Sequence, residues 1–325
     1  MKNYSKQVYI ALLSIMSLCL LMDYVPGAGF LGSWVTPPVA LFLGLVFALT
    51  LGQPFPKFNK KASKMLLQYS VVGLGFGMNL QKSLQSGAEG MAFTIISVVG
   101  TMLIGWIIGR KLLKVDRITS YLISSGTAIC GGSAIAAVGP VVKAKDAEMS
   151  VSLGTIFILN AIALFIFPPI GEALGMTQQQ FGTWAAIAIH DTSSVVGAGQ
   201  AYGEEALQIA TTIKLTRALW IIPLALVSSL IFKSKGQRIS IPWFILFFVL
   251  AMIFNTYVLE PTEMGSAIGS FINGIARKSL TVTLFFIGAS LSLDVLKTVG
   301  VKPLIQGVLL WIVISLSTVA YIYCF

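Results

Sequence analysis

Long apolar runs recur from one end of the chain to the other, and this pattern constrains the fold more than any other feature. Hydrophobic residues make up 56% of the sequence and charged residues only 10%, a balance that no soluble core requires. Nine runs are long enough for a membrane-crossing helix of roughly 20 residues, allowing for tilt. They are Val8–Met22, Trp34–Leu51, Met65–Leu80, Met91–Ile108, Ser150–Pro168, Ala206–Phe232, Ile241–Leu259, Leu280–Leu293 and Leu304–Tyr323. We therefore predict an all-α integral membrane protein that forms one polytopic domain over residues 1–325.

The first run follows Lys2 and Lys6, an arrangement that signal peptides share. No small-residue cleavage site follows it, and Leu18 precedes Cys19 where a lipoprotein site needs a small residue. We expect a retained first helix. The three cysteines show neither a disulfide pattern nor metal-ligand spacing, so we predict no metal and no cofactor.

The sequence has 22 basic and 12 acidic residues, and the basic residues gather in loops on one side of the predicted spans. Lysine and arginine mark the cytoplasmic loops of membrane proteins, so the excess indicates topology and predicts no nucleic-acid partner. The clusters are Lys57, Lys60, Lys61 and Lys64; Arg110, Lys111, Lys114 and Arg117; and Lys233, Lys235 and Arg238. We predict a multi-pass protein of the bacterial inner membrane with a cytoplasmic N-terminus.

Two further apolar segments, Ile118–Val142 and Phe181–Ala201, contain glycine, hydroxyl and ionisable residues. A helix is interrupted at membrane depth only where the gap is buried in protein or lines an aqueous cavity, and paired interruptions are typical of transporters. If both segments cross, the chain has eleven spans and Lys143 and Lys145 lie outside. If both are re-entrant hairpins, it has nine spans and these lysines stay inside, which the charge rule weakly favours.

An internal similarity relates the two segments. An offset of 60 residues aligns Cys130 with His190, Ser133 with Ser193 and Gly139 with Gly199. Residues 75–80 and 288–293 form a second similar pair. In the hairpin topology both pairs are oppositely oriented, as an inverted repeat requires. We predict a first repeat at about 34–170 and a second, permuted repeat at about 177–325.

The first interrupted segment holds the substrate-binding candidates Gly126, Thr127, Cys130, Gly131, Gly132 and Ser133. Its glycines let the chain leave helical geometry without Cβ strain. The half-helix that follows presents free N–H groups, which attract an anion, and the hydroxyl groups add donors. The alternative is that these small residues only allow close helix packing.

The second segment holds His190 beside Asp191, followed by Thr192, Ser193 and Ser194. His190 is the only histidine in the chain, and an ionisable pair at membrane depth is usually functional. We predict that His190 and Asp191 couple transport to a proton or a cation and that the three hydroxyl residues bind substrate. Alternatively, Asp191 is only an N-cap, with His190 at a wetted rim.

Lys214 and Arg217 lie one helical turn apart within Ala206–Phe232 and share a face. Arg217 can bind an oxyanion through two N–H groups, so both are predicted to bind substrate; the alternative is that both snorkel to the outer surface. Asn79 and Asn160 are weaker candidates, because either can simply bridge two helices.

These residues carry a resemblance to a known family. Residues 126–137, 143–145 and 189–199, together with Lys214-Leu-Thr-Arg217, resemble the YeiH-type family of bacterial multi-pass membrane proteins over nearly the whole chain. The resemblance implies export of sulfate or a related sulfur oxyanion. A weaker similarity to the bile acid:sodium symporter group, carried by residues 75–80 and 150–155, implies a panel domain and a core domain with discontinuous helices. The permuted second half departs from that group, so its sodium-binding residues are not carried over.

Together these features predict a secondary transporter for a small anion that works by alternating access, is coupled to a proton or sodium ion, and is compatible with a homo-oligomer. A sodium-coupled organic-acid carrier and an anion channel are the alternatives. An intramembrane enzyme using Ser193 or Ser194 beside His190 is disfavoured, because adjacent residues rarely orient as nucleophile and base. We therefore expect no enzymatic activity.

Overall fold

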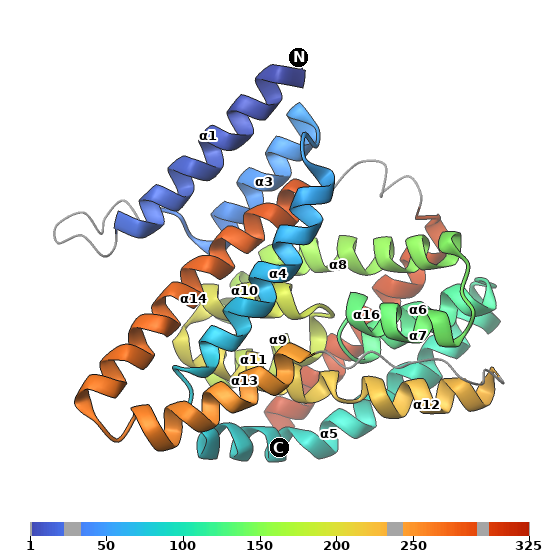
Figure 1. Ribbon diagram of the computed structural model, residues 1–325. Helices are drawn as coiled ribbons and strands as arrows, with labels where there is room; N and C mark the ends of the chain where they lie inside the picture. The colour runs from blue at the N-terminus through green and yellow to red at the C-terminus, as the bar shows by residue number, and fades with distance from the viewer. Residues whose placement is uncertain (1, 23–33, 233–242, 291–298, 325) are drawn as a thin grey trace. The chain divides into compact units, whose positions relative to one another are not determined.

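Every element that the structure describes is a helix, which confirms the predicted all-α fold (Figure 1). The structure is a computed structural model and describes residues 2–22, 34–232, 243–290 and 299–324. Within these residues, five helices are long and apolar enough to cross a membrane. They are Tyr4–Leu21, Phe93–Leu112, Asp146–Ala173, Glu204–Ile231 and Val301–Cys324. Shorter apolar helices at Pro37–Leu51 and Trp243–Leu259 match two more of the predicted spans.

The helices form two compact units, each built from two separate stretches of chain. The first unit comprises Met1–Gln81 and Pro242–Leu293, and the second comprises Lys82–Ile241 and Asp294–Phe325. Both interrupted segments belong to the second unit. The single transporter domain with repeats at 34–170 and 177–325 stays a prediction.

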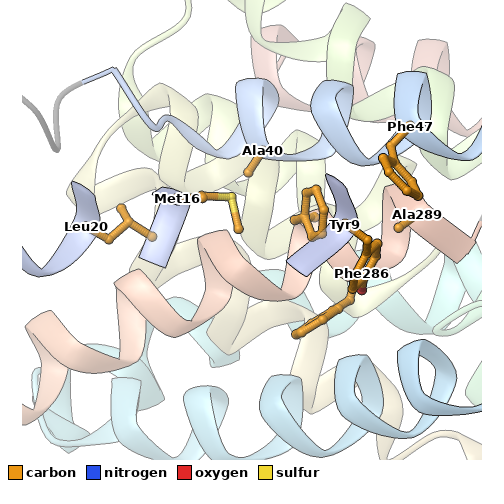
Figure 2. Close-up of a cluster of buried hydrophobic side chains, with 8 residues drawn as sticks. Tyr9, Met16, Leu20, Ala40, Phe47, Phe286 and Ala289 are labelled. Atoms are coloured by element: carbon orange, nitrogen blue, oxygen red, sulfur yellow. The ribbon is translucent and has the colours of Figure 1, made fainter. Parts of the chain in front are cut away.

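The first unit contains five α-helices and a short π-helix. They are α1 (Lys2–Leu21), α3 (Pro37–Leu51), α4 (Pro56–Gly75), α13 (Trp243–Phe254), the π-helix η3 (Asn255–Leu259) and α14 (Glu263–Ser290). Side chains of α1, α3 and α14, including Tyr9, Phe47 and Phe286, form its hydrophobic core (Figure 2). Helices α3 and α14 approach so closely that a Cβ on Gly44 would lie 2.3 Å from the Phe285 carbonyl oxygen, so glycine is required there.

The second unit contains most of α5 and the remaining helices. They are α5 (Leu80–Trp106) with the π-helix η2 (Ile107–Leu112), α6 (Arg117–Ala128), α7 (Gly132–Val141), α8 (Asp146–Ala173), α9 (Gln178–Ala188), α10 (Thr192–Tyr202), α11 (Glu204–Ala218), α12 (Ile221–Ile231) and α16 (Val301–Cys324). Helix α8 is central, because it packs against α6, α7, α10 and α16.

Two predicted spans have different boundaries in the structure. Helix α14 begins at Glu263, well before the predicted start at Leu280, and residues 291–293 of that span lie outside the described residues. The predicted span Ala206–Phe232 is two helices, α11 and α12. Pro223 explains this break, because it has no N–H to donate to the Leu219 carbonyl and its ring clashes with a continuing helix.

The first interrupted segment is a helical hairpin made of α6 and α7, which we call the first hairpin (Figure 1). A Cβ on Gly126 of α6 would lie 2.9 Å from Ile135 of α7. Nearer the open end, Leu122 shares a hydrophobic cluster with Val138 and Val142. The two arms therefore run antiparallel, and the chain leaves the hairpin at the end where it entered.

The second interrupted segment, α9 and α10, is also a hairpin, which we call the second hairpin. Phe181 near the start of α9 stacks on Tyr202 at the end of α10, with ring centroids 3.8 Å apart. Arms of 10 to 12 residues are about 15–18 Å long, roughly half of a 30 Å hydrocarbon core. Of the two predicted topologies, this packing agrees with hairpins and does not agree with eleven crossing spans.

The hairpins reach the middle of α8 from opposite ends. The first opens beside the start of α8, since only residues 142–145 separate α7 from it. The second opens beside the end of α8, where the Tyr202 hydroxyl donates to the Met176 carbonyl at 2.6 Å. Their tips, residues 129–131 and 189–191, lie beside Ile156 and Asn160 at the middle of α8. This opposite orientation is what an inverted repeat requires.

Candidate functional site

The two hairpins break at equivalent positions. Helix α6 ends at Ala128 and α7 begins at Gly132, while α9 ends at Ala188 and α10 begins at Thr192. Both pairs of helix ends are 60 residues apart. The offset that aligned Cys130 with His190 in the sequence is therefore also the spacing of the two breaks in the structure.

The hairpin tips contact each other through Gly131. This residue has φ +65, and a Cβ on it would lie 3.2 Å from the Asp191 Cα atom. Positive φ favours glycine, and the close approach leaves little room for a side chain. The structure thus brings the two predicted segments together at one place.

Gly126 and Thr127 have a different role from the one predicted for them. Both lie inside α6 rather than at its break. Gly126 allows the two arms of the first hairpin to pack, because a Cβ there would meet Ile135. The packing alternative considered for the small residues therefore holds for Gly126, whereas Gly131 forms the turn itself.

Two cations of α11 bind the carbonyl ends of the two hairpins. Lys214 Nζ donates to the carbonyls of Ala186 and Ile189, at 3.2 Å and 2.7 Å, at the end of α9. Arg217 donates to the Ala128 carbonyl at 2.5 Å, at the end of α6, and to the Ser97 hydroxyl at 2.9 Å. A helix C-terminus attracts positive charge. We call Lys214 and Arg217 the α11 cations.

Both α11 cations are fully buried, with an exposed fraction of 0%. The alternative that they snorkel to the membrane surface is therefore wrong. The guanidinium Nε of Arg217 has no hydrogen-bond partner, so this side chain keeps a donor beyond those that bind Ala128 and Ser97. Direct contact of either cation with a substrate stays a prediction.

Asn160 of α8 binds the tip of the second hairpin. Its Oδ1 accepts hydrogen bonds from the backbone N–H groups of His190 and Asp191, at 3.1 Å and 3.2 Å. Breaking a helix deprives such N–H groups of their carbonyl partners, and Asn160 replaces them. Sequence reasoning ranked this residue low. The available signal was a single amide in the middle of an apolar run.

Asp191 is the N-cap of α10, as one alternative held. Its Oδ2 accepts from the Ser193 N–H at 3.0 Å and from the Ser193 hydroxyl. The Ser193 hydroxyl is thus directed to Asp191 and not to His190. Thr192 and Ser194 are buried in the same helical turn. Whether Asp191 also takes part in coupling stays a prediction.

The start of α7 differs from that of α10, because no side-chain hydrogen bond caps it. The first N–H groups of a helix have no partner within it, and here they belong to Gly132 and the residues that follow. Ser133 is exposed, whereas Cys130 at the tip is 1% exposed. An uncapped helix N-terminus beside buried cations attracts an anion.

Several buried polar atoms near the tips lack a hydrogen-bond partner. His190 is 1% exposed, and neither ring nitrogen has a partner. The Thr127 hydroxyl and the Asn160 Nδ2 are unpaired as well. Buried polar groups are normally hydrogen-bonded, so these atoms mark a place where a ligand fits. Among the described residues, no three His, Cys, Asp or Glu side chains gather as metal ligands would.

Comparison with known proteins identifies the family. The family described as Conserved hypothetical protein 698 matches residues 10–307. A UPF0324 membrane protein of Bacteroides thetaiotaomicron is 75% identical over 323 residues, which cover 99% of this chain and 97% of the relative. The chain belongs to the UPF0324 family of membrane proteins. The UPF0324 protein of Porphyromonas gingivalis is 61% identical, over 98% of this chain and 97% of its own.

The UPF0324 family is the YeiH-type family that the sequence resembles, so this identification is confirmed. A more distant UPF0324 protein, from Photobacterium profundum, is 50% identical over 89% of this chain and 87% of its own. The names of these UPF0324 relatives state that they are membrane proteins and name no substrate. No solved structure matches the chain significantly.

Proposed function

We propose that this UPF0324 protein is a secondary transporter that moves a small anion across the inner membrane by alternating access, with its N-terminus in the cytoplasm. One observation carries the proposal. Two hairpins approach from opposite ends of α8, and their tips meet at its midpoint next to two buried cations. Binding at the midplane between oppositely oriented repeats is typical of secondary transporters.

In this proposal the anion lies at the start of α7. The N–H groups of Gly132 and Ser133 and the Ser133 hydroxyl donate to its oxygen atoms, as helix N-termini do in other anion sites. The α11 cations supply positive charge from within the protein. Thr127, Cys130 and the hydroxyl residues 192–194 complete the surroundings of the site.

His190 and Asp191 are proposed to couple transport to a proton. His190 is the one histidine of the chain, its ring nitrogens are free to exchange a proton, and histidine can change charge near neutral pH. Sulfate or a related sulfur oxyanion is suggested by the family resemblance. We propose that the protein is a carrier without enzymatic activity, working in the lipid bilayer.

The test is uptake of labelled sulfate into proteoliposomes, with and without a pH gradient. We expect saturable, gradient-stimulated uptake by the wild type, and its loss in His190→Ala and in Ser133→Leu. Ser150→Leu is the control, because Ser150 is an exposed serine at the other end of the same unit's central helix. Non-saturable flux would favour a channel, and a sodium requirement would favour a sodium-coupled carrier. Normal uptake by both well-inserted site variants would refute the site.

A further inference from the structure

The two hairpin tips differ at one position that the 60-residue spacing makes directly comparable. Asp191 is the N-cap of α10, and Gly131, 60 residues earlier, is the N-cap of α7. The second hairpin thus carries a carboxylate at the start of its second arm, while the first hairpin carries no side chain there.

The occupied tip shows how an anion is held in this architecture. Ser193 donates both its N–H and its hydroxyl to one carboxylate oxygen of Asp191. Ser133 is the counterpart of Ser193 in the first hairpin, with the same two donors at the same place in its helix. Since no side chain caps α7, these donors are available to an anion that the protein does not itself supply.

Independent observations point to a ligand beside this helix start. Gly131 packs against Asp191, and the adjacent His190 is 1% exposed with both ring nitrogens unpaired. The Thr127 hydroxyl, 0% exposed, is unpaired in the arm that leads to the same tip. Unpaired polar groups at such burial are rare in proteins.

The charges around the tips limit the charge of that ligand. Lys214 and Arg217 contribute two positive charges, and Asp191 contributes one negative charge. The helix ends carry about half a charge each, and they cancel, because two C-termini and two N-termini converge at the tips. With His190 and Cys130 counted as uncharged, one positive charge remains.

We propose that the start of α7 binds one monovalent oxyanion of carboxylate or sulfonate type, held by Ser133 as Ser193 holds the Asp191 carboxylate. This inference rests on the carrier function proposed above and specifies its substrate class. A dianion such as sulfate needs one more positive charge at the tips. In the proton-coupled carrier, a proton taken up with the dianion supplies it.

The test is equilibrium binding to the purified full-length protein in nanodiscs, measured by isothermal titration at neutral pH and constant ionic strength. The probes are methanesulfonate and sulfate, which share sulfur–oxygen geometry and differ by one charge. We expect the wild type to bind methanesulfonate at least about tenfold more tightly than sulfate. Asp191→Asn removes a nearby unit charge and should reverse this preference by at least about tenfold. Asparagine is also a good N-cap, so α10 keeps its start.

Asp146→Asn is the matched control, because it makes the same charge change at an exposed position at the start of α8. It should keep the wild-type preference. Equal or tighter binding of sulfate by the wild type, or a preference that Asp191→Asn leaves unchanged, would overturn the inference. If the folded wild type binds neither anion, the proposed anion carrier itself fails.

Discussion

Gly131 meets two requirements that no other residue type meets together. Its φ of +65 disfavours side chains, and a Cβ would lie 3.2 Å from the Asp191 Cα atom. We predict that Gly131→Ala separates the hairpin tips and abolishes anion transport. Proteoliposome uptake and the thermal unfolding midpoint measure the two effects.

Gly175 provides the control for this substitution. It has a similar φ of +63, but a Cβ there would have open space around it. Gly175→Ala should therefore lose only about 1–2 kcal/mol of stability from the left-handed backbone and keep transport. Equal effects of the two substitutions on transport would show that contact between the tips is not required.

At the residue level, the sequence located the right positions but not their partners. The breaks near Cys130 and His190 followed from glycine and polar residues in apolar runs. Lys214 and Arg217 were recognised as unusual at membrane depth, yet the carbonyl groups they bind belong to helices 25 to 89 residues away along the chain. No local pattern specifies such contacts.

Among the helices, α11 acts as a common support for both hairpins, because its two cations bind one hairpin each. We predict that Arg217→Met increases backbone hydrogen exchange at residues 126–133, whereas Lys214→Met increases it at residues 186–193. The reason is that each substitution leaves a buried helix end without its cation and donor, at a cost of about 1–3 kcal/mol.

Hydrogen exchange followed by mass spectrometry measures this in the full-length protein. Thr216→Val is the control, since Thr216 lies between the two cations and its hydroxyl bonds within α11, to the Ile213 carbonyl. If either cation variant loosened both tips equally, or neither tip, the separate roles of Lys214 and Arg217 would be wrong.

The helices also show where prediction from sequence fails. Apolar length and charge left hairpins and crossings open, because both place apolar residues in the membrane. Contacts within each segment, such as Phe181 with Tyr202, distinguish them, and these depend on how the chain folds back. Likewise, α14 extends back to Glu263, because helical geometry continues through polar residues that a hydropathy pattern excludes.

For the whole molecule, the division into two units could not have been foreseen. Each unit combines an early and a late stretch of the chain, whereas a sequence pattern describes only neighbouring residues. The membrane class, the all-α fold and the family were predictable because they depend on composition and on motifs that extend along the chain.

The central claim is that the transported anion binds at the start of α7, where the hairpin tips meet. The most direct measurement is the rate at which a thiol reagent labels Ser133→Cys, with Cys19 and Cys324 replaced by serine and the buried Cys130 retained. Lys143→Cys, exposed at the open end of the same hairpin, is the control. We predict that methanesulfonate slows labelling of Ser133→Cys in a saturable way and leaves Lys143→Cys unaffected. Labelling of Ser133→Cys that no transported anion slows would contradict the account.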